Sequence, residues 1–214
     1  MLSTLALVIL AISSISAISL KARQSADACG GLGHGVSSNA ASFTLAAYNP
    51  NGDNANDTGI PLVVSRTGVT EVTVGPSHGM LSTYSSYRQA PFPELSLVKN
   101  ALLPRNGAAN IGYSTDLSVA SGAELEFEFS NSASELPPPA PIYCIVQNFS
   151  PAGLADTAML AVNGAISHFS LCQSLVAMPE GASPLINVVY NATEDNDGLY
   201  VYSTCYSVVI HVVY

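Results

Sequence analysis

Turn-forming sequences recur along this chain, and the apolar segments outside them lack the period of a helix. Clear examples are the runs NPNGDNANDTG at 49–59, PRNG at 104–107, NG at 163–164 and DNDG at 195–198. Asn-Gly, Asp-Gly and Pro-containing runs favour the tight turns that connect β-strands. No stretch after residue 24 keeps a helical period of apolar residues over a dozen positions. The sequence therefore predicts an all-β fold.

The apolar segments of the chain are short and rich in β-branched residues, which favour strands. They predict strands at 43–48, 60–64, 69–74, 95–98, 111–114, 117–119, 125–129, 142–146, 158–162, 168–171, 186–190, 199–202 and 206–213. Many short strands separated by turns are typical of a β-sandwich or a β-barrel.

A weak internal repeat favours the barrel. Leu95 and Met159 each begin an apolar strand, a turn with Asn and a second apolar strand, and Phe43 begins a similar first copy. Three such units suit a closed barrel with pseudo-threefold symmetry. We therefore expect a β-trefoil-like barrel of short strands with two disulfides, and the alternative is an antiparallel β-sandwich.

One predicted strand has a strict period of two residues. Carboxylates alternate there with apolar side chains, in the order Glu124, Leu125, Glu126, Phe127, Glu128 and Phe129. Alternation places the two kinds on opposite faces of the strand. Three carboxylates on one face can hold calcium or act as acid and base, but the simpler interpretation is a solvated face opposite a core face.

The N-terminus predicts export. Residues 2–20 form an apolar run broken by Ser and Thr, and the small residues Ser14, Ser16 and Ala17 suit a signal-peptidase site. We expect a signal peptide at 1–17, a Gly- and Ser-rich N-terminal segment at 18–41 and a single all-β domain at 42–214. The protein is then secreted, extracellular or in the cell wall, with no membrane partner after cleavage.

The four cysteines, Cys29, Cys144, Cys172 and Cys205, predict two disulfides in an exported chain. Three pairings are open, and we favour Cys29–Cys205 with Cys144–Cys172. The first bridge would tie the start of the domain to its last strands, and the second would close a short loop. The cysteines lack the Cys-x-x-Cys spacing of a zinc site, so neither a metal nor another cofactor is expected.

Three Asn-x-Ser/Thr sequons begin at Asn56, Asn148 and Asn191. In a secreted protein such sequons are acceptors for N-glycans, provided that they lie on surface loops. Asn148 is the weakest of the three, because Pro151 follows its Ser150.

Charge excludes some classes of partner. The chain has 15 acidic and 6 basic residues, for a net charge of −9, and its basic residues do not cluster. Binding to nucleic acid needs clustered Lys and Arg, so nucleic acid is not expected as a partner. We expect a monomer whose partner is cell-wall polysaccharide.

No catalytic residue can be nominated. The sequence has no Gly-x-Ser-x-Gly motif around a nucleophile, and its acids do not single out a catalytic pair. Sugar binding is the sharper hypothesis, because rigid amphipathic rings beside hydrogen-bonding groups suit sugars. Tyr200 and Tyr202 would share one face of a strand and form a glycan platform. The alternative for these two residues is ordinary packing between strands.

Motifs along most of the chain carry a resemblance to a known group. They are CGGLG at 29–33, FTLAAYN at 43–49, NDTGIPLVV at 56–64, SLVKNALLP at 96–104, IYC at 142–144, LAVNGAISHFSLC at 160–172, NVVYNAT at 187–193 and TCY at 204–206. With them the chain resembles uncharacterised small secreted, cysteine-containing proteins of mushroom-forming fungi. More distantly, LSLVKNALL, NIGYS, ELEFEF and LPPPAP within 95–142 resemble the C-terminal domain of Pir-type fungal cell-wall proteins. The sequence has no Pir-type repeat with its wall-linking glutamine, so covalent attachment to glucan is not implied.

The resemblance implies a secreted or wall-associated role and no known catalytic residue. We therefore expect a non-catalytic secreted protein of the fungal cell wall or extracellular matrix that associates with carbohydrate. The alternatives are a secreted hydrolase and a trefoil-type protease inhibitor with its specificity in an exposed loop such as 49–59.

Overall fold

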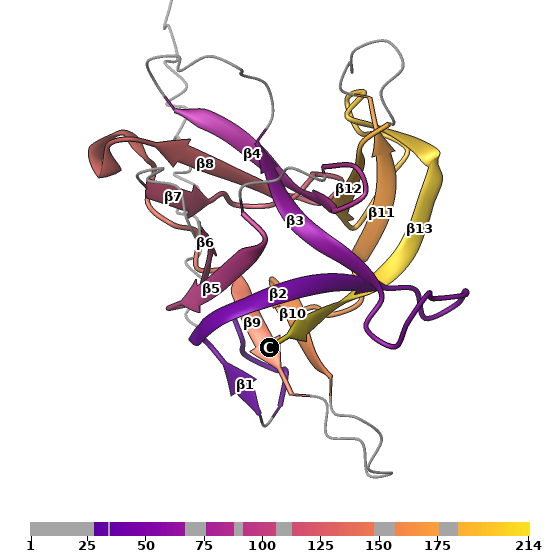
Figure 1. Ribbon diagram of the computed structural model, residues 1–214, viewed down its shortest axis with the longest axis horizontal. Coiled ribbons are helices and arrows are strands. Elements are labelled where there is room, and N and C mark those ends of the chain that lie inside the picture. Colours follow the sequence, from indigo (N-terminus) through magenta and orange to yellow (C-terminus); the bar gives the residue numbers. More distant parts are fainter. Residues whose placement is uncertain are drawn as a thin grey trace, which may run out of the picture.

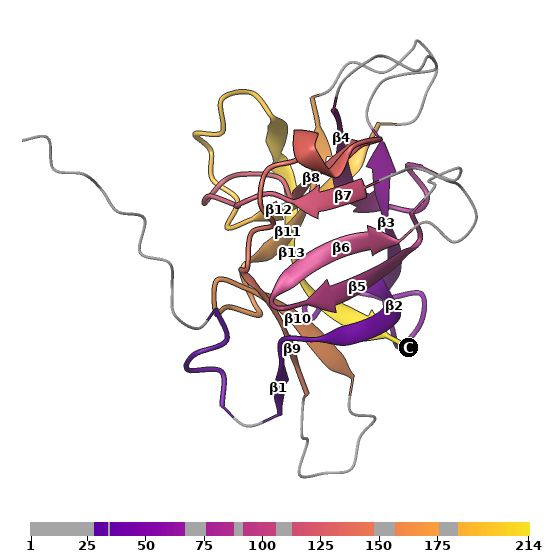
Figure 2. The same ribbon diagram turned by 90° about the vertical axis from the view of Figure 1, so that its left-hand side faces the viewer.

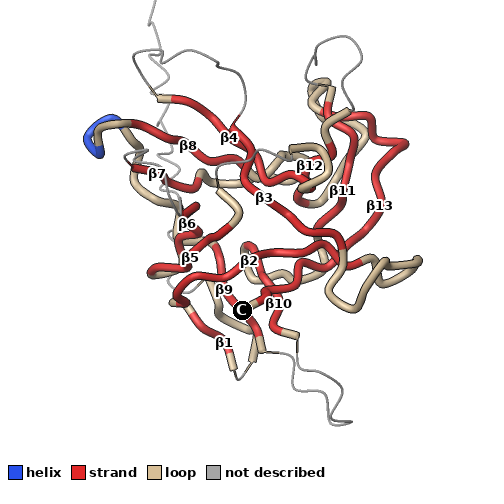
Figure 3. Tube along the Cα trace, viewed as in Figure 1, coloured by secondary structure: helices blue, strands red, loops and turns tan. Residues whose placement is uncertain are grey.

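Strands form nearly all of the regular structure in this chain (Figure 3). The computed structural model describes residues 28–33, 35–66, 76–87, 92–105, 113–147, 157–175 and 184–214. Within them lie one short 3-10 helix, Ala133–Glu135, and thirteen strands: β1 Val36–Ser37, β2 Ala40–Tyr48, β3 Ile60–Arg66, β4 Ser77–Thr83, β5 Glu94–Val98, β6 Ala101–Arg105, β7 Tyr113–Asp116, β8 Glu126–Ser130, β9 Tyr143–Val146, β10 Ala158–Val162, β11 Phe169–Ser174, β12 Ile186–Tyr190 and β13 Tyr200–Val213.

Six of these strands close an antiparallel barrel in the order β2-β3-β4-β12-β11-β13. The ring closes where the end of β13 pairs with β2, from Val209 opposite Tyr48 to Val213 opposite Thr44. Its narrowest contact joins β4 to β12 through the single pair Ser82 and Asn187. The prediction of an all-β, trefoil-like barrel with two disulfides is confirmed, and the sandwich alternative is not adopted.

Three antiparallel pairs of strands extend the barrel (Figures 1 and 2). The pair β5–β6 attaches to β2, β8–β7 attaches to β4, and β10–β9 attaches to β13. All three lie between β4 and β11 in the chain. Of the three predicted repeat copies, the one at Leu95 forms a tight hairpin, β5–β6, whose turn residues Lys99 and Asn100 have positive φ. The copy at Met159 turns at Asn163 and Gly164, but the strands on either side of that turn, β10 and β11, pair with other strands.

The core follows from alternation along the strands. In β8, Phe127 and Phe129 are buried as predicted, and Leu125 just before the strand is buried with them. The ring of Phe129 stacks on that of Phe92 at 4.5 Å between centroids. Burial of each large apolar side chain contributes about 1.5–3 kcal/mol relative to its exposure. Most of the buried apolar side chains form one continuous cluster, and two smaller clusters contain the disulfide residues Cys144 and Cys172.

The predicted strand positions are mostly correct, and the errors have local causes. Residues 117–119 do not form a strand, because after one hydrogen bond from Leu117 to Glu126 the chain leaves β8 for the turn at Gly122. The segments 199–202 and 206–213 belong to one strand, β13. Strand β4 was not predicted, since SHGMLST has little β-branched character. Residues 69–74 and the first two of 111–114 lie outside the described residues.

The predicted disulfide pairing is wrong, although all four cysteines are bridged. The bridges are Cys29–Cys144 and Cys172–Cys205. A disulfide needs Cα atoms within about 7 Å, a separation that directly paired strands provide. β11 pairs with β13, which brings Cys172 to Cys205, whereas β9 and β11 are not paired with each other.

The Cys29–Cys144 bridge anchors the N-terminal segment. Strand β1 pairs with β9, so the turn that contains Cys29 lies beside Cys144. The side-chain amide of Asn100 donates to the carbonyl of Tyr143 and contacts the sulfur of Cys29, which ties this corner to the β5–β6 turn. The order of the strands in the sequence does not reveal that the N-terminal segment pairs with β9 and is bridged to it, and not to the last strands.

The predicted signal peptide, residues 1–17, lies outside the described residues. Among the residues that the structure describes, no helix has the length and apolar character needed to cross a membrane.

The buried carboxyl group of Asp116 on β7 accepts hydrogen bonds beside the edge strand β6. Strand β6 lies next to β7 (Figure 2). The amide of Leu102 and the carbonyl of Pro104 on β6 form hydrogen bonds with side chains of β7. One carboxyl oxygen of Asp116 accepts from that amide at 2.8 Å, and the other accepts from the amide of Ala140 at 2.8 Å. The hydroxyl of Ser114 donates to Pro104 at 3.1 Å. Side chains thus replace a regular ladder between β6 and β7, and an unpaired edge open to aggregation is avoided.

Asp116→Asn should change how stability depends on pH. Burial raises the pKa of Asp116 from 3.8 to about 7, so the fold favours the neutral carboxyl. Its contribution to the free energy of unfolding is therefore largest below pH 3.8, falls as the pH rises to about 7 and is constant above that. In the variant, the decrease in stability between pH 3.8 and about 7 should disappear. The variant should also be about 1–3 kcal/mol less stable, because one backbone amide loses its hydrogen-bond acceptor.

Urea denaturation between pH 4 and pH 8 measures this difference. The exposed Asp195 provides the matched control, and Asp195→Asn should retain the wild-type slope. Parallel stability curves for wild type and Asp116→Asn would contradict the assignment.

Candidate functional site

A wide bulge in β13 creates the most distinctive surface feature of the barrel. Leu171 of β11 pairs with Tyr206, but Gln173 pairs with Val201, so residues 202–205 stand opposite Cys172 alone. The hydroxyl of Thr204 holds the bulge, since it donates to the carbonyl of Val201 at 2.6 Å and accepts from the amide of Gln173 at 3.0 Å. The extra residues leave the ladder and project from the sheet.

The Cys172–Cys205 disulfide fixes the end of this bulge. Cys172 is fully buried and packs with Val189 and Tyr200, whereas Cys205 is half-buried at the surface. The bridge therefore joins β11 to β13 within a small cluster of its own, apart from the main core that Phe169 and Leu171 of β11 enter. Bulges that redirect side chains are common at functional sites.

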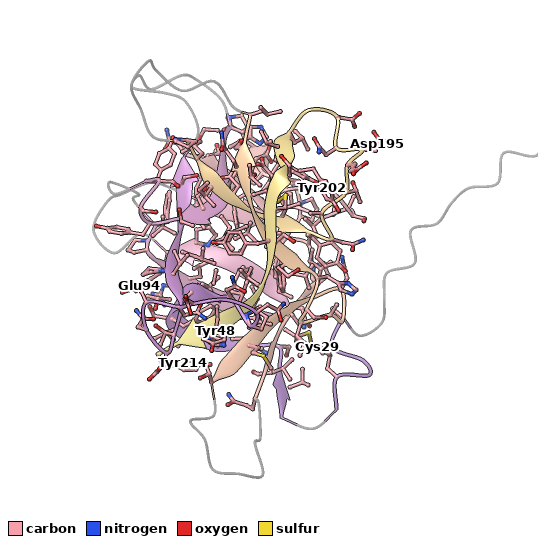
Figure 4. The ribbon with its side chains drawn as sticks, turned by 90° about the vertical axis from the view of Figure 1, so that its right-hand side faces the viewer. Cys29, Tyr48, Glu94, Asp195, Tyr202 and Tyr214 are labelled. Atoms are coloured by element: carbon pink, nitrogen blue, oxygen red, sulfur yellow. A yellow bond between two sulfur atoms is a disulfide. The ribbon has the colours of Figure 1, made fainter. Side chains whose placement is uncertain are left out.

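An open groove of about 450 Å³ lies between the bulge, the start of β11 and the turn after β12. Tyr202 is 42% exposed at its rim, and Figure 4 shows it on β13 at the same end of the molecule as Asp195. His168 and Asn191 are also exposed and line the groove. Four serines supply hydroxyl groups: Ser167, Ser170, Ser203 and Ser207. The groove thus combines the exposed ring of Tyr202 with several side chains that can form hydrogen bonds.

The wall of the groove opposite the bulge is a rigid turn. Asn191 adopts a φ of 47°, and its amide donates to the carbonyl of His168 at 2.6 Å. The hydroxyl of Tyr200 accepts from the amide of Thr193 and donates to its carbonyl, at 2.9 and 3.1 Å. These bonds tie the turn to β11 and to β13, so the groove is preformed.

Half of the predicted tyrosine platform is wrong. Tyr200 is only 2% exposed and serves as a buried anchor for the turn, while Tyr202 is exposed at the groove. Simple alternation placed both on one face, but the bulge begins after Val201 and breaks the alternation. The sequence did not single out His168, Asn191 and the four serines as groove residues, because they meet only through the pairing of β11 with both β12 and β13.

The predicted glycosylation sites differ in their surroundings. Asn56 is exposed on the loop between β2 and β3, and its side-chain oxygen accepts from the amides of Thr58 and Gly59. Asn191 is exposed in the wall of the groove. Asn148 lies outside the described residues. Glycosylation of these sequons stays a prediction.

The three carboxylates of segment 124–129 do not share one environment. Glu124 is 2% exposed, so the predicted solvated face is wrong at this position. Glu126 and Glu128 are half-buried, and Glu128 lies 3.6 Å from the imidazole of His78. No group of three His, Cys, Asp or Glu residues in the described parts of the chain is arranged to hold a metal ion.

Glu124 belongs to a buried polar network. Its carboxyl accepts from the side-chain amide of Asn187 at 2.8 Å, and Asn187 in turn accepts from the hydroxyl of Ser82 at 2.7 Å. Burial raises the pKa of Glu124, and the neighbouring charge of Glu126 raises it further. Both residues also line a second cavity of about 400 Å³ beside the Pro137–Pro138 turn. The network supports the narrow contact between β4 and β12.

No protein-family model matches the chain, and no curated protein or solved structure matches it either. Its fold and groove define a disulfide-bonded all-β barrel with an open, polar and aromatic surface groove.

Removal of the Cys172–Cys205 bridge should loosen the groove. The chain-entropy relation gives about 4 kcal/mol for a separation of 33 residues and about 5 kcal/mol for the 115 residues of Cys29–Cys144. We expect Cys172→Ala/Cys205→Ala to lose stability of that order and to exchange the amide hydrogens of residues 201–206 faster.

Hydrogen exchange followed by mass spectrometry measures this local effect. The matched control is Cys29→Ala/Cys144→Ala, which should lower global stability while residues 201–206 keep their protection relative to the rest of the barrel. Equal relative protection of the bulge in both double variants would show that the bridge does not hold it.

Proposed function

We propose that this protein is a non-catalytic extracellular protein of the fungal cell wall or matrix that associates with carbohydrate through the groove beside Tyr202. The observation that carries the proposal is the exposed ring of Tyr202, held on a bridged bulge at the rim of a preformed groove rich in hydroxyl groups. Sugars present apolar C–H faces and hydroxyl groups, which suit a ring flanked by donors and acceptors.

The chemistry of the groove favours neutral saccharides. Among its lining residues, which all belong to the described part of the chain, there is no Lys, Arg, Asp or Glu. Ser and Asn side chains both donate and accept hydrogen bonds, as sugar hydroxyls require. Neutral wall polysaccharides such as β-glucan and chitin are therefore the proposed partners, in preference to charged ones.

An extracellular location fits the two disulfides, which form and persist in oxidising compartments. The fungal wall or matrix as the destination is supported by the resemblance of the sequence motifs to secreted fungal proteins. The groove itself supports only the carbohydrate part of the proposal.

Tyr202→Ala should weaken binding to insoluble polysaccharide. Full burial of a large apolar side chain contributes about 1.5–3 kcal/mol, and a saccharide would cover part of the ring, so we expect an affinity loss of about tenfold. Co-sedimentation with β-glucan, chitin and whole fungal walls measures it. Tyr113→Ala is the control, because Tyr113 is 53% exposed on β7 and does not line the groove. Absence of saturable pelleting on all three materials would overturn the proposal.

A secreted hydrolase is the second candidate, and one observation favours it. Glu124, with its raised pKa, and Glu126 both line the second cavity, and glycosidases use paired carboxyl groups in different protonation states. Under this alternative, wild type releases reducing ends from the same polysaccharides and Glu124→Gln does not. Our proposal predicts no release by either protein.

A further inference from the structure

Residues 121–125 form a strap that holds one wall of the groove without lining the groove themselves. The strap runs antiparallel to β12 and continues beside the turn that follows it. The amide of Gly122 donates to the carbonyls of Tyr190 and Asn191 at 2.8 and 3.1 Å. In return, the amide of Tyr190 donates to the carbonyl of Ala123 at 2.9 Å. The strap therefore fixes the backbone of the turn that carries the groove residue Asn191.

The strap also fills the place where the barrel wall is narrowest. Strands β4 and β12 pair directly only at Ser82 and Asn187. Beyond that pair, Leu125 lies between the two strands, since its amide donates to Val188 of β12 and its carbonyl accepts from Leu81 of β4. Release of the strap would therefore loosen both this part of the barrel and the groove wall.

The side chain that fixes the strap is the carboxyl of Glu124, which is only 2% exposed. It accepts hydrogen bonds from Asn187 of β12 and from Ser174 of β11. Val189, which pairs with Glu124, belongs to the small buried cluster around Cys172. Glu124 is therefore linked to both β11 and β12, and groove residues lie at the start of β11 and just after β12.

The surroundings of this carboxyl favour its neutral form. Its two hydrogen-bond partners are uncharged, and no cation in the described part of the chain is paired with it. Burial raises the pKa of Glu124, and the neighbouring charge of Glu126 raises it further. Because a buried carboxylate without a cation is costly, ionisation of Glu124 weakens the contacts that hold the strap.

Other carboxyl groups near the strap are directed elsewhere. Asp116 accepts from the amides of Leu102 and Ala140, and Glu128 faces His78. The carboxylates of the turn after β12 are exposed, and they are Glu194, Asp195 and Asp197. Strands β11 and β12 present neutral groups to Glu124. Glu124, with Glu126 beside it, is therefore the group through which pH acts on the strap.

We propose that the strap is a pH-sensitive device for the groove: protonated Glu124 holds the turn at Asn191 in place, and ionised Glu124 releases that turn and weakens saccharide binding. The inference rests on the proposed function, since it concerns regulation of the same groove. Because the folded state favours the proton, Glu124 stabilises the strap fully below pH 4.5. This contribution is lost as the pH rises through the raised pKa of Glu124, so binding is strongest in acidic surroundings.

Hydrogen exchange followed by mass spectrometry tests the strap without any saccharide. Protection factors of residues 121–125 and 186–193 in the secreted chain are measured from pH 4 to pH 8, corrected for the intrinsic exchange rate and divided by those of β10. In wild type we expect this relative protection to fall at least about threefold over the range. In Glu124→Gln it should stay at the acidic wild-type level, because Gln can accept from Asn187 but cannot ionise.

Two further variants separate Glu124 from its neighbours. Glu126→Gln removes the nearby charge, so the fall in protection should remain but move to lower pH. Glu194→Gln removes an exposed carboxylate of the same turn and should keep the wild-type profile. His168 is present in every variant, so any effect of its charge is common to all of them.

Pelleting on β-glucan and chitin at pH 5 and pH 8 connects the strap to binding. We expect wild type to bind at least about threefold more weakly at pH 8 than at pH 5. Glu124→Gln should bind equally well at both.

The outcomes separate this inference from the proposed function. The inference is overturned by equal pH profiles of protection in wild type and Glu124→Gln, or by pelleting that ignores pH while the strap responds to it. In either case, pelleting that depends on Tyr202 leaves the proposed function standing. A pH-dependent strap in wild type but not in Glu124→Gln, with no pelleting by any protein, supports the release of the turn and overturns saccharide binding instead.

Discussion

Closure of the barrel depends on β13. This strand pairs with β11 along its first half and with β2 and β10 near its end, so three separate parts of the chain meet on it (Figure 1). Without the pairing from Val209 to Val213, β2 would have a free edge and the ring of six strands would be open. Edge strands expose unpaired backbone groups, so closure protects the fold as well as stabilising it. The buried side chains Val208, Ile210 and Val212 fix the register, because a slip by one residue would turn them outward.

The candidate site also lies on β13, at the bulge where its pairing with β11 is interrupted. Between Val201 and Tyr206 the chain leaves the ladder, and four residues stand opposite Cys172. The disulfide and the bonds of Thr204 convert this interruption into a fixed projection. A ring held in this way loses little conformational entropy on binding, which is the general advantage of a preorganised surface. Structure and proposed function therefore share one feature, the bulge of β13.

Local patterns predicted much of the fold and little of the site. The alternation of Leu125, Phe127 and Phe129 was enough to place a core strand, and the turn residues Lys99 and Asn100 matched a hairpin, since both signals act over a few residues. The predicted disulfide pairing and the predicted exposure of Tyr200 were both wrong, and for one physical reason. Each depends on which distant strands pair and in what register. The carboxyl of Asp116 accepts a hydrogen bond from Leu102 of β6, fourteen residues away in the chain. No local sequence pattern indicates this contact, for the same reason. A groove built from β11, β13 and the turn after β12 can be located only once those pairings are known.

The central claim is that the bulge presents Tyr202 to a neutral saccharide, and amide and tyrosine-ring NMR shifts during titration with β-glucan and chitin oligosaccharides test it most directly. The account predicts saturable shifts concentrated at Tyr202, Ser203 and His168, with the ring of Tyr113 unchanged. Shifts centred on the cavity beside Glu124, or no saturable shift anywhere in the barrel, would contradict it.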